Sequence, residues 1–252
     1  MHKSLLTALL GGVFLVSLPQ GRADDSEAKT VIDKAIKAHG GEDNVVKLQQ
    51  ARVKSKGTMM IMGMKVGFTS DSICQLPKKS KQTITLAAGD QKITVVQVIS
   101  GSKAWVVSAG ETKDLEGEEL KALLEDNFSN HVESLAPLLK DKDFTLSAIA
   151  EVKVNGKPAA GVKVKAKDHK DIDLFFDKET GLLVRVARNG YNAETMKEAM
   201  FEIVYSDFKD FSGVKQPAKA RLTRDGKPFA DVEVTSLQLL DKVNPNEFTK
   251  SF

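Results

Sequence analysis

Apolar and polar side chains alternate along residues 171–213 in a way that predicts three consecutive β-strands. Successive side chains of a strand point to opposite faces, so a two-residue period produces one apolar face. Turn sequences separate the three segments: Lys178-Glu179-Thr180-Gly181, Asn189-Gly190 and Ser212-Gly213. The apolar positions are Ile172, Leu174 and Phe176, then Leu182, Val184 and Val186, then Phe201, Ile203 and Tyr205. The pattern predicts an up-and-down antiparallel sheet with one apolar face.

The strands predicted before and after this region differ in the number of their apolar faces. Residues 51–110 contain about four or five strand-length segments. Several of these segments are apolar at consecutive positions, for example Val95-Val96 and Trp105-Val106-Val107. Later strands alternate, as in Val162 and Val164 against lysines. A strand that is apolar on both faces has to be covered on both, by a core on one side and by helices or a ligand on the other.

Two segments have the periodicity of amphipathic helices. In residues 24–39 the apolar side chains recur every three or four positions, and Gly40-Gly41 ends the segment. Residues 116–139 carry leucine, valine and phenylalanine at similar spacing. We therefore predict a mainly β fold with helices (α+β): a half-open antiparallel β-barrel with an N-terminal helix and a short helical lid.

The N-terminal residues resemble an export signal. Lys3 precedes an apolar run from Leu5 to Leu18, and Gly21-Arg22-Ala23 suits a signal peptidase. The run is too short for a membrane span, which needs about 20 apolar residues. We expect cleavage near Ala23, a periplasmic or secreted protein, and one domain over residues 24–252.

Charge and cysteine content narrow the classes of partner. The chain has 37 basic residues, of which Lys3 and Arg22 belong to the expected signal, leaving 35 against 34 acidic residues. This balance gives no basis for binding nucleic acid. Cys74 is the single cysteine, so no intramolecular disulfide can form. We expect Cys74 to be a buried, inert thiol and the protein to be a monomer.

The sequence contains no recognisable catalytic constellation. It lacks a GxSxG elbow, an HExxH metal motif, a phosphate-binding glycine loop and paired cysteines. His39, His131 and His169 are far apart in the sequence, and we interpret them as surface or helix-capping residues. We therefore expect no enzyme activity and no cofactor.

The methionines near the first predicted hairpin allow two interpretations. Met60, Met62 and Met64 would project on one face of a strand, and stacked thioethers can bind Cu(I). Alternatively, flexible thioethers line an adaptable apolar cavity. Small inward residues such as Ala218 and Ala220 favour an under-filled interior, although the predicted helices could also plug it.

Several short motifs occur in an order that resembles the LolA/LolB-like outer-membrane lipoprotein carriers. They follow the export signal and first helix, and they are Leu76-Pro77-Lys78-Lys79, Gly101-Ser102-Lys103-Ala104-Trp105, Phe176-Asp177-Lys178-Glu179-Thr180-Gly181-Leu182, Tyr205-Ser206-Asp207-Phe208 and Gly213-Val214-Lys215-Gln216-Pro217. The resemblance spans nearly the whole mature chain. It implies a half-open barrel that carries acyl chains inside and is closed by a helical lid.

The resemblance departs from the carrier pattern at one position. Carriers often have a basic residue immediately before the strand proline, where it latches the lid, whereas this chain has Leu76 before Pro77. Lys78, Lys79 and Arg52 are the candidates to replace it. No cysteine follows the apolar run, which indicates a soluble shuttle rather than a lipid-anchored receptor.

These expectations combine into one functional hypothesis. The protein would be a non-enzymatic periplasmic carrier or binder of lipid or acylated, lipoprotein-type ligands, acting in outer-membrane biogenesis. Its partners would be acyl chains and envelope membrane proteins. The residues expected to line the hydrophobic cavity are Met60, Met62, Met64, Trp105, Leu124 and Phe176. The alternatives are an envelope sensor or protein-interaction module and, less favoured, a methionine-based Cu(I) protein.

Overall fold

The computed structural model describes residues 21–89, 91–139, 142–192 and 194–250. Of the expected export signal, only residues 21–23 fall within this part of the chain, at the beginning of the first helix. The helices are α1 (Gly21–Ala38), α2 (Glu42–Val45) and α3 (Gly117–Glu133), with 3₁₀ turns η1 (Val46–Gln49), η2 (Ala136–Leu139) and η3 (Pro245–Phe248). None of the described helices is long and apolar enough to cross a membrane.

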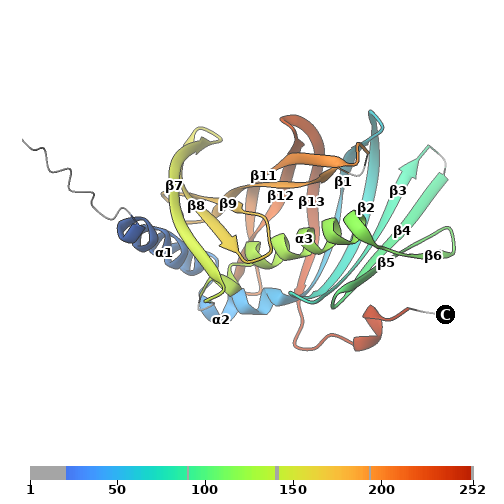
Figure 1. Ribbon diagram of the computed structural model, residues 1–252, viewed down its shortest axis with the longest axis horizontal. Coiled ribbons are helices and arrows are strands. Elements are labelled where there is room, and N and C mark those ends of the chain that lie inside the picture. The colour runs from blue at the N-terminus through green and yellow to red at the C-terminus, as the bar shows by residue number, and fades with distance from the viewer. Residues whose placement is uncertain (1–20, 90, 140–141, 193, 251–252) are drawn as a thin grey trace, which may run out of the picture.

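The strands form one 13-stranded antiparallel sheet in the described chain (Figure 1). They are β1 (Gln50–Ile61), β2 (Met64–Gln75), β3 (Lys79–Ala88), β4 (Gln91–Ser100), β5 (Lys103–Ser108), β6 (Glu111–Asp114), β7 (Phe144–Val154), β8 (Lys157–Ala166), β9 (Ile172–Asp177), β10 (Leu183–Asn192), β11 (Lys197–Phe211), β12 (Val214–Arg224) and β13 (Lys227–Leu239). The spatial order is β6-β5-β4-β3-β2-β1-β13-β12-β11-β10-β9-β8-β7. Two meanders therefore meet at the β1–β13 pair, and the sheet remains open at β6 and β7.

The sheet has an inner face, which α1 and α3 cover, and an outer face (Figure 1). On β1 the inner face carries Ala51, Val53, Ser55, Gly57 and Met59, and the residues between them point outward. This architecture confirms the predicted mainly β, half-open barrel with an N-terminal helix and a short helical lid.

Helix α1 packs through one stripe against the end of the sheet formed by β7 and β8. Ala28, Ile32, Ala35 and Ile36 lie on this stripe, and none is more than 4% exposed. They recur at the three- and four-residue spacing that places side chains on one helix face. The stripe contacts inner-face residues such as Val162 and Leu174, which are fully buried.

Two local details of β10 differ from the predicted alternation. A register shift between Leu183 and Arg185 turns Leu183 and Val186 toward the core, so Leu182, Val184 and Val186 do not share a face. Asn189-Gly190 is not a turn either, because β10 continues to Asn192 and pairs there with β11. Glycine is required at position 190 because a Cβ atom would lie 2.8 Å from the ring of Phe201.

Candidate functional site: the cavity beneath helix α3

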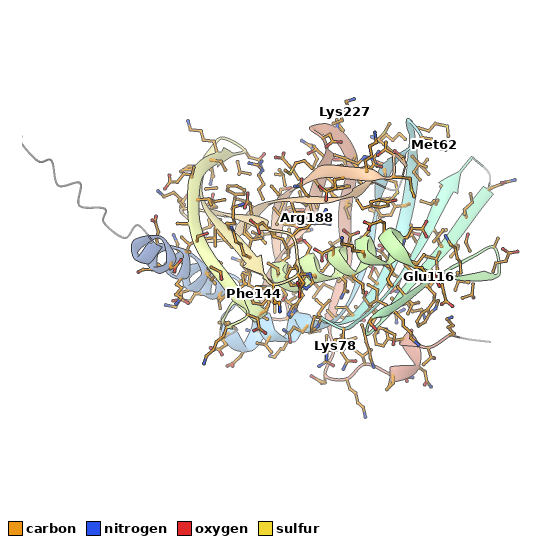
Figure 2. The ribbon with its side chains drawn as sticks, in the orientation of Figure 1. Met62, Lys78, Glu116, Phe144, Arg188 and Lys227 are labelled. Atoms are coloured by element: carbon orange, nitrogen blue, oxygen red, sulfur yellow. The ribbon has the colours of Figure 1, made fainter. Side chains whose placement is uncertain are left out.

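Ion pairs and a buried hydrogen-bond network fix the C-terminal half of α3 to β10 and β11. The Arg188 guanidinium donates to Asp126 Oδ1 over 2.7 Å. The Tyr205 hydroxyl donates to one oxygen of Glu133, and the Ser129 hydroxyl donates to the other over 2.8 Å. Figure 2 shows Arg188 over the helix that it holds. Side chains from β10 and β11 bind this half of α3, which therefore belongs to the core.

The loop between β8 and β9 adds a second attachment to α3. His169 Nδ1 lies 2.7 Å from Glu125 Oε1, and the His169 ring stacks on Phe128 with the centroids 3.6 Å apart. The Lys170 backbone N–H donates to the other oxygen of Glu125. These contacts join the loop to the middle of the helix.

The third attachment occupies the position where the resemblance places a latch. The Asn127 side-chain amide donates to the carbonyl oxygen of Pro77. Arg52 instead pairs with Asp71 at 2.7 Å, and Lys79 lies over the Phe248 ring, both on the outer face. Pro77 therefore contacts the lid through an uncharged hydrogen bond.

A cavity lies beneath α3 in the half of the inner face formed by β13 and β1–β4. Its volume is about 450 Å³, within the range of small-molecule sites in proteins. Leu123, Asn127 and Asn130 contribute to its roof, and Val53, Ser72 and other strand residues form its floor. The other half of the inner face, at β7–β11, is filled by α1, η2 and the end of α3.

A polar row crosses the floor of the cavity, and beyond the cavity the inner face becomes apolar toward the tip of the β1–β2 hairpin. The strand register aligns Ser72, Gln82 and Gln97 in one row across β2, β3 and β4. The next row toward the hairpin tip contains Ser70, Ile84 and Val95, and the row beyond it contains Phe68, Leu86 and Ile93. Ile93 is 45% exposed, and Ile84 and Leu86 are half-buried. No described element covers this apolar end completely.

The charged groups around the cavity are already paired or shifted toward neutrality. Burial raises the pKa of the Glu133 carboxyl, although the hydrogen bonds from Tyr205 and Ser129 oppose the shift. Burial and the adjacent carboxylate raise the pKa of Tyr205 well above its ordinary value. The Lys81 ammonium pairs with Glu247 at 2.9 Å and points away from the cavity. Among the described lining residues, no unpaired cation faces the interior.

None of the six residues expected to line the cavity is among those that do so in the structure. Phe176 is 1% exposed and packs in the filled half of the inner face. Trp105 lies on the outer face, where it packs against Val243 and Phe248 of the C-terminal segment. Leu124 is half-buried on α3, next to the lining residue Leu123.

The expectation that Met60, Met62 and Met64 share a strand face is wrong. Met62 and Gly63 form the β1–β2 turn with φ angles of 49° and 78°. Met60 pairs with Lys65, whereas Met64 pairs with Ile61, so the two thioethers lie on opposite faces. Met62 is 82% exposed at the hairpin tip, at the opposite end of the strands from Lys78 (Figure 2). The stacked thioether site that the copper hypothesis requires is therefore not formed.

His39 and His131 are buried rather than superficial, being 2% and 9% exposed. His39 Nε2 accepts the Leu183 backbone N–H over 3.0 Å, so the ring proton resides on Nδ1, which lies 2.6 Å from the carbonyl oxygen of Lys215. Burial lowers the pKa of His39 from 6.5 to about 4. His39 is therefore a neutral structural bridge from the end of α1 to β10 and β12. In the described chain, no group of three or more His, Cys, Asp or Glu side chains is placed to hold a metal ion.

The outer face carries a second hollow, a groove of about 770 Å³ across β11, β12, β13 and β1–β4. Its charged side chains are Lys56, Lys65, Lys92, Lys219, Arg221, Asp231 and Glu233. Arg221 lies 3.4 Å from Asp231, and Lys56 lies 3.6 Å from Glu233. Cations exceed carboxylates in this outer groove, which distinguishes it from the cavity beneath α3.

Sequence reasoning missed the residues that give the inner cavity its polar lining. Polar residues on a strand usually point to water, so Ser72, Gln82 and Gln97 carry no individual sign that they line a cavity. Their common row is visible only in the register of three strands. A local signal did exist, since Ser70 and Ser72 precede Cys74 at the two-residue spacing of one strand face.

Comparison with known proteins identifies the fold. No family model matches the sequence, and no curated protein matches it significantly. Among solved structures, a LolA superfamily protein from Nitrosomonas europaea aligns with a TM-score of 0.57 at 10% identity, covering 88% of this chain and 97% of that one. A putative outer membrane lipoprotein-sorting protein domain from Vibrio parahaemolyticus aligns with a TM-score of 0.56 at 8% identity, covering 89% and 97%. A DUF1329 family protein from Desulfovibrio piger aligns with a TM-score of 0.56 at 14% identity, covering 88% and 97%. The chain therefore has the LolA/LolB-like fold.

Proposed function

We propose that this protein is a non-enzymatic carrier or binder of lipid or acylated ligands in the bacterial envelope. The observation that supports the proposal is the incomplete filling of the inner face. A cavity of about 450 Å³ lies beneath α3, and apolar rows of the same sheet face adjoin it at the hairpin end of β1–β4. An acyl chain on these rows would gain about 0.8 kcal/mol for each buried methylene group.

The location and the cargo class have support of different kinds. Residues 1–23 have the composition of an export signal, which favours the periplasm or secretion. The solved structures with the same fold include one described as a lipoprotein-sorting domain, which favours acylated cargo. Together they favour a carrier in outer-membrane biogenesis over an intracellular role.

The first experiment is native mass spectrometry of protein purified from its own envelope, followed by titration with a fluorescent fatty acyl probe. We expect co-purifying lipid and saturable probe binding. Cys74 is half-buried and lines the cavity, rather than fully buried as the sequence predicts, so bound acyl ligand should also slow its alkylation by N-ethylmaleimide. Protein that arrives empty and takes up no probe would rule out the carrier function.

A matched pair of variants tests whether the ligand occupies the inner cavity. Ser72→Trp places an indole in the cavity, whereas Thr83→Trp places one on the outer face of the neighbouring strand. We expect Ser72→Trp to reduce probe binding at least about tenfold, because the indole takes the volume of the ligand. Thr83→Trp should bind normally, and an equal loss in both variants would contradict the site.

The outer groove supports a second candidate, a protein-interaction module in an envelope sensor. Its excess of lysine and arginine would complement an acidic segment of a partner. This function predicts a stable, salt-sensitive complex in pull-downs from envelope extracts. Reversing the charge at Lys65 and Lys92 should abolish that complex and leave acyl binding intact.

A further inference from the structure

The cavity beneath α3 contains polar side chains with unused hydrogen-bonding capacity. Within the described chain, the side chains of Ser72, Gln82 and Gln97 make no hydrogen bond to protein atoms, and all three are half-buried. Asn127 is 4% exposed, and its side-chain oxygen is enclosed without a partner. An acyl chain on this row would displace the water that hydrogen-bonds these side chains, and it could not replace those hydrogen bonds. The middle of the cavity is therefore a poor place for the apolar part of a ligand.

The electrostatics of the same row disfavour a charged group. An anionic head would lie near Asp126 and Glu133. Arg188, which pairs with Asp126, and Lys81, the cation among the described lining residues, are both engaged in ion pairs. A cationic head would find Asp126 already bound to Arg188 and Glu133 already hydrogen-bonded to Tyr205 and Ser129. An uncharged group that both donates and accepts hydrogen bonds satisfies the serine and amide side chains without a counter-ion.

We infer that the cavity beneath α3 holds the uncharged, polyhydroxylated head of an amphiphile whose acyl chain lies on the apolar rows toward the β1–β2 hairpin. The inference rests on the proposed function and names the ligand class for that site. Gln82 and Leu86 are four residues apart on one face of β3, so head and chain sites are about 13 Å apart. One extended amphiphile spans this distance.

The test compares ligands that share a twelve-carbon chain and differ in the head. Dodecyl maltoside, dodecylphosphocholine, dodecanoate and dodecyl phosphate are titrated calorimetrically below their micellar concentrations, together with free maltose. We expect the maltoside to bind about tenfold more tightly than either anion, which is the effect of about two additional hydrogen bonds. Free maltose should bind far more weakly than the maltoside, because it lacks the chain.

Variants locate the preference in the polar row. Gln82→Leu combined with Gln97→Leu should weaken maltoside binding about tenfold and leave dodecanoate binding unchanged or improved. Gln238→Leu is the matched control, because Gln238 is exposed and pairs with Arg52 on the outer face. Thermal unfolding monitored by circular dichroism confirms that each variant is folded before it is titrated.

The possible outcomes distinguish failure of the head assignment from failure of the proposed acyl-binding function. Equal affinity for all heads, tighter binding of an anion, or no effect of the double variant would overturn the head assignment while the acyl-binding function remains. Maltose binding as tightly as the maltoside would overturn the amphiphile and indicate a saccharide site. Failure of every amphiphile to bind would overturn the function and the inference together.

Discussion

The two halves of the inner face are both antiparallel, and they differ in how completely side chains fill the space beneath the helices. At β7–β11, side chains such as Leu174, Phe176 and Val186 are at most 1% exposed beneath α1 and the end of α3. At β1–β4, the corresponding rows contain serine and glutamine around a cavity of about 450 Å³. The difference shows that the filled half supplies stability and anchors the lid. The open half is therefore free to have a composition suited to a ligand.

Truncating one large side chain in each half tests whether the two halves differ in packing. Phe176→Ala should lower the free energy of unfolding by about 3–5 kcal/mol, because it leaves a cavity in a close-packed region. Ile84→Ala in the open half should cost about 1 kcal/mol, since that side chain is only half-buried. Urea unfolding measures both values, and equal losses would mean that the two halves are packed alike.

Acid should destabilise the filled half through His39. This residue binds its proton less tightly in the folded protein, where its pKa is about 4, than in the unfolded chain, where it is 6.5. Protonation therefore favours unfolding. The difference between the two pKa values corresponds to about 3 kcal/mol of unfolding free energy. This contribution is fully present above pH 6.5 and is lost as the pH falls toward 4.

Unfolding free energies measured between pH 7 and 4 check this prediction. The variant His39→Gln cannot titrate, so its stability should be lower at pH 7 and should change less over the same interval. If the unfolding free energy of the wild type and of His39→Gln changed equally with pH, another group would control acid unfolding.

Loss of the Tyr205 hydroxyl should weaken the attachment of α3 and lower the stability of the protein. Tyr205→Phe leaves one oxygen of the Glu133 carboxyl without its donor, which should cost about 1–3 kcal/mol. The matched control is Tyr191→Phe, because the Tyr191 hydroxyl contacts Met196 at an exposed site. Thermal unfolding compares the two, and an equally small shift would show that the network does not hold the helix.

The sequence predicted the fold well because the relevant signals are local. The two-residue period at Ile172, Leu174 and Phe176 and the helical stripe of residues 24–39 each fall within one element and reflect burial directly. The candidate lining residues were predicted less well. Trp105 is covered by the C-terminal segment around Phe248, and that contact joins residues too far apart in the chain for any local pattern to indicate it.

Hairpin geometry explains the methionine error in the same terms. A turn at Met62-Gly63 sends the chain back, so the face of Met64 depends on the pairing register and not on a count of two from Met62. Asn127, which holds Pro77, and His39, which bridges α1 to β10 and β12, are likewise defined by long-range contacts. Composition alone indicated neither role.

Side-chain period and turn chemistry act over a few residues, so the sequence indicates which segments are strands and helices and that one face of the sheet is buried. Which half of that face is filled, and which polar side chains meet in the cavity, becomes visible only in three dimensions. These depend on strand register and on the position of α3, and the contacts that hold α3 join residues 44 to 72 positions apart.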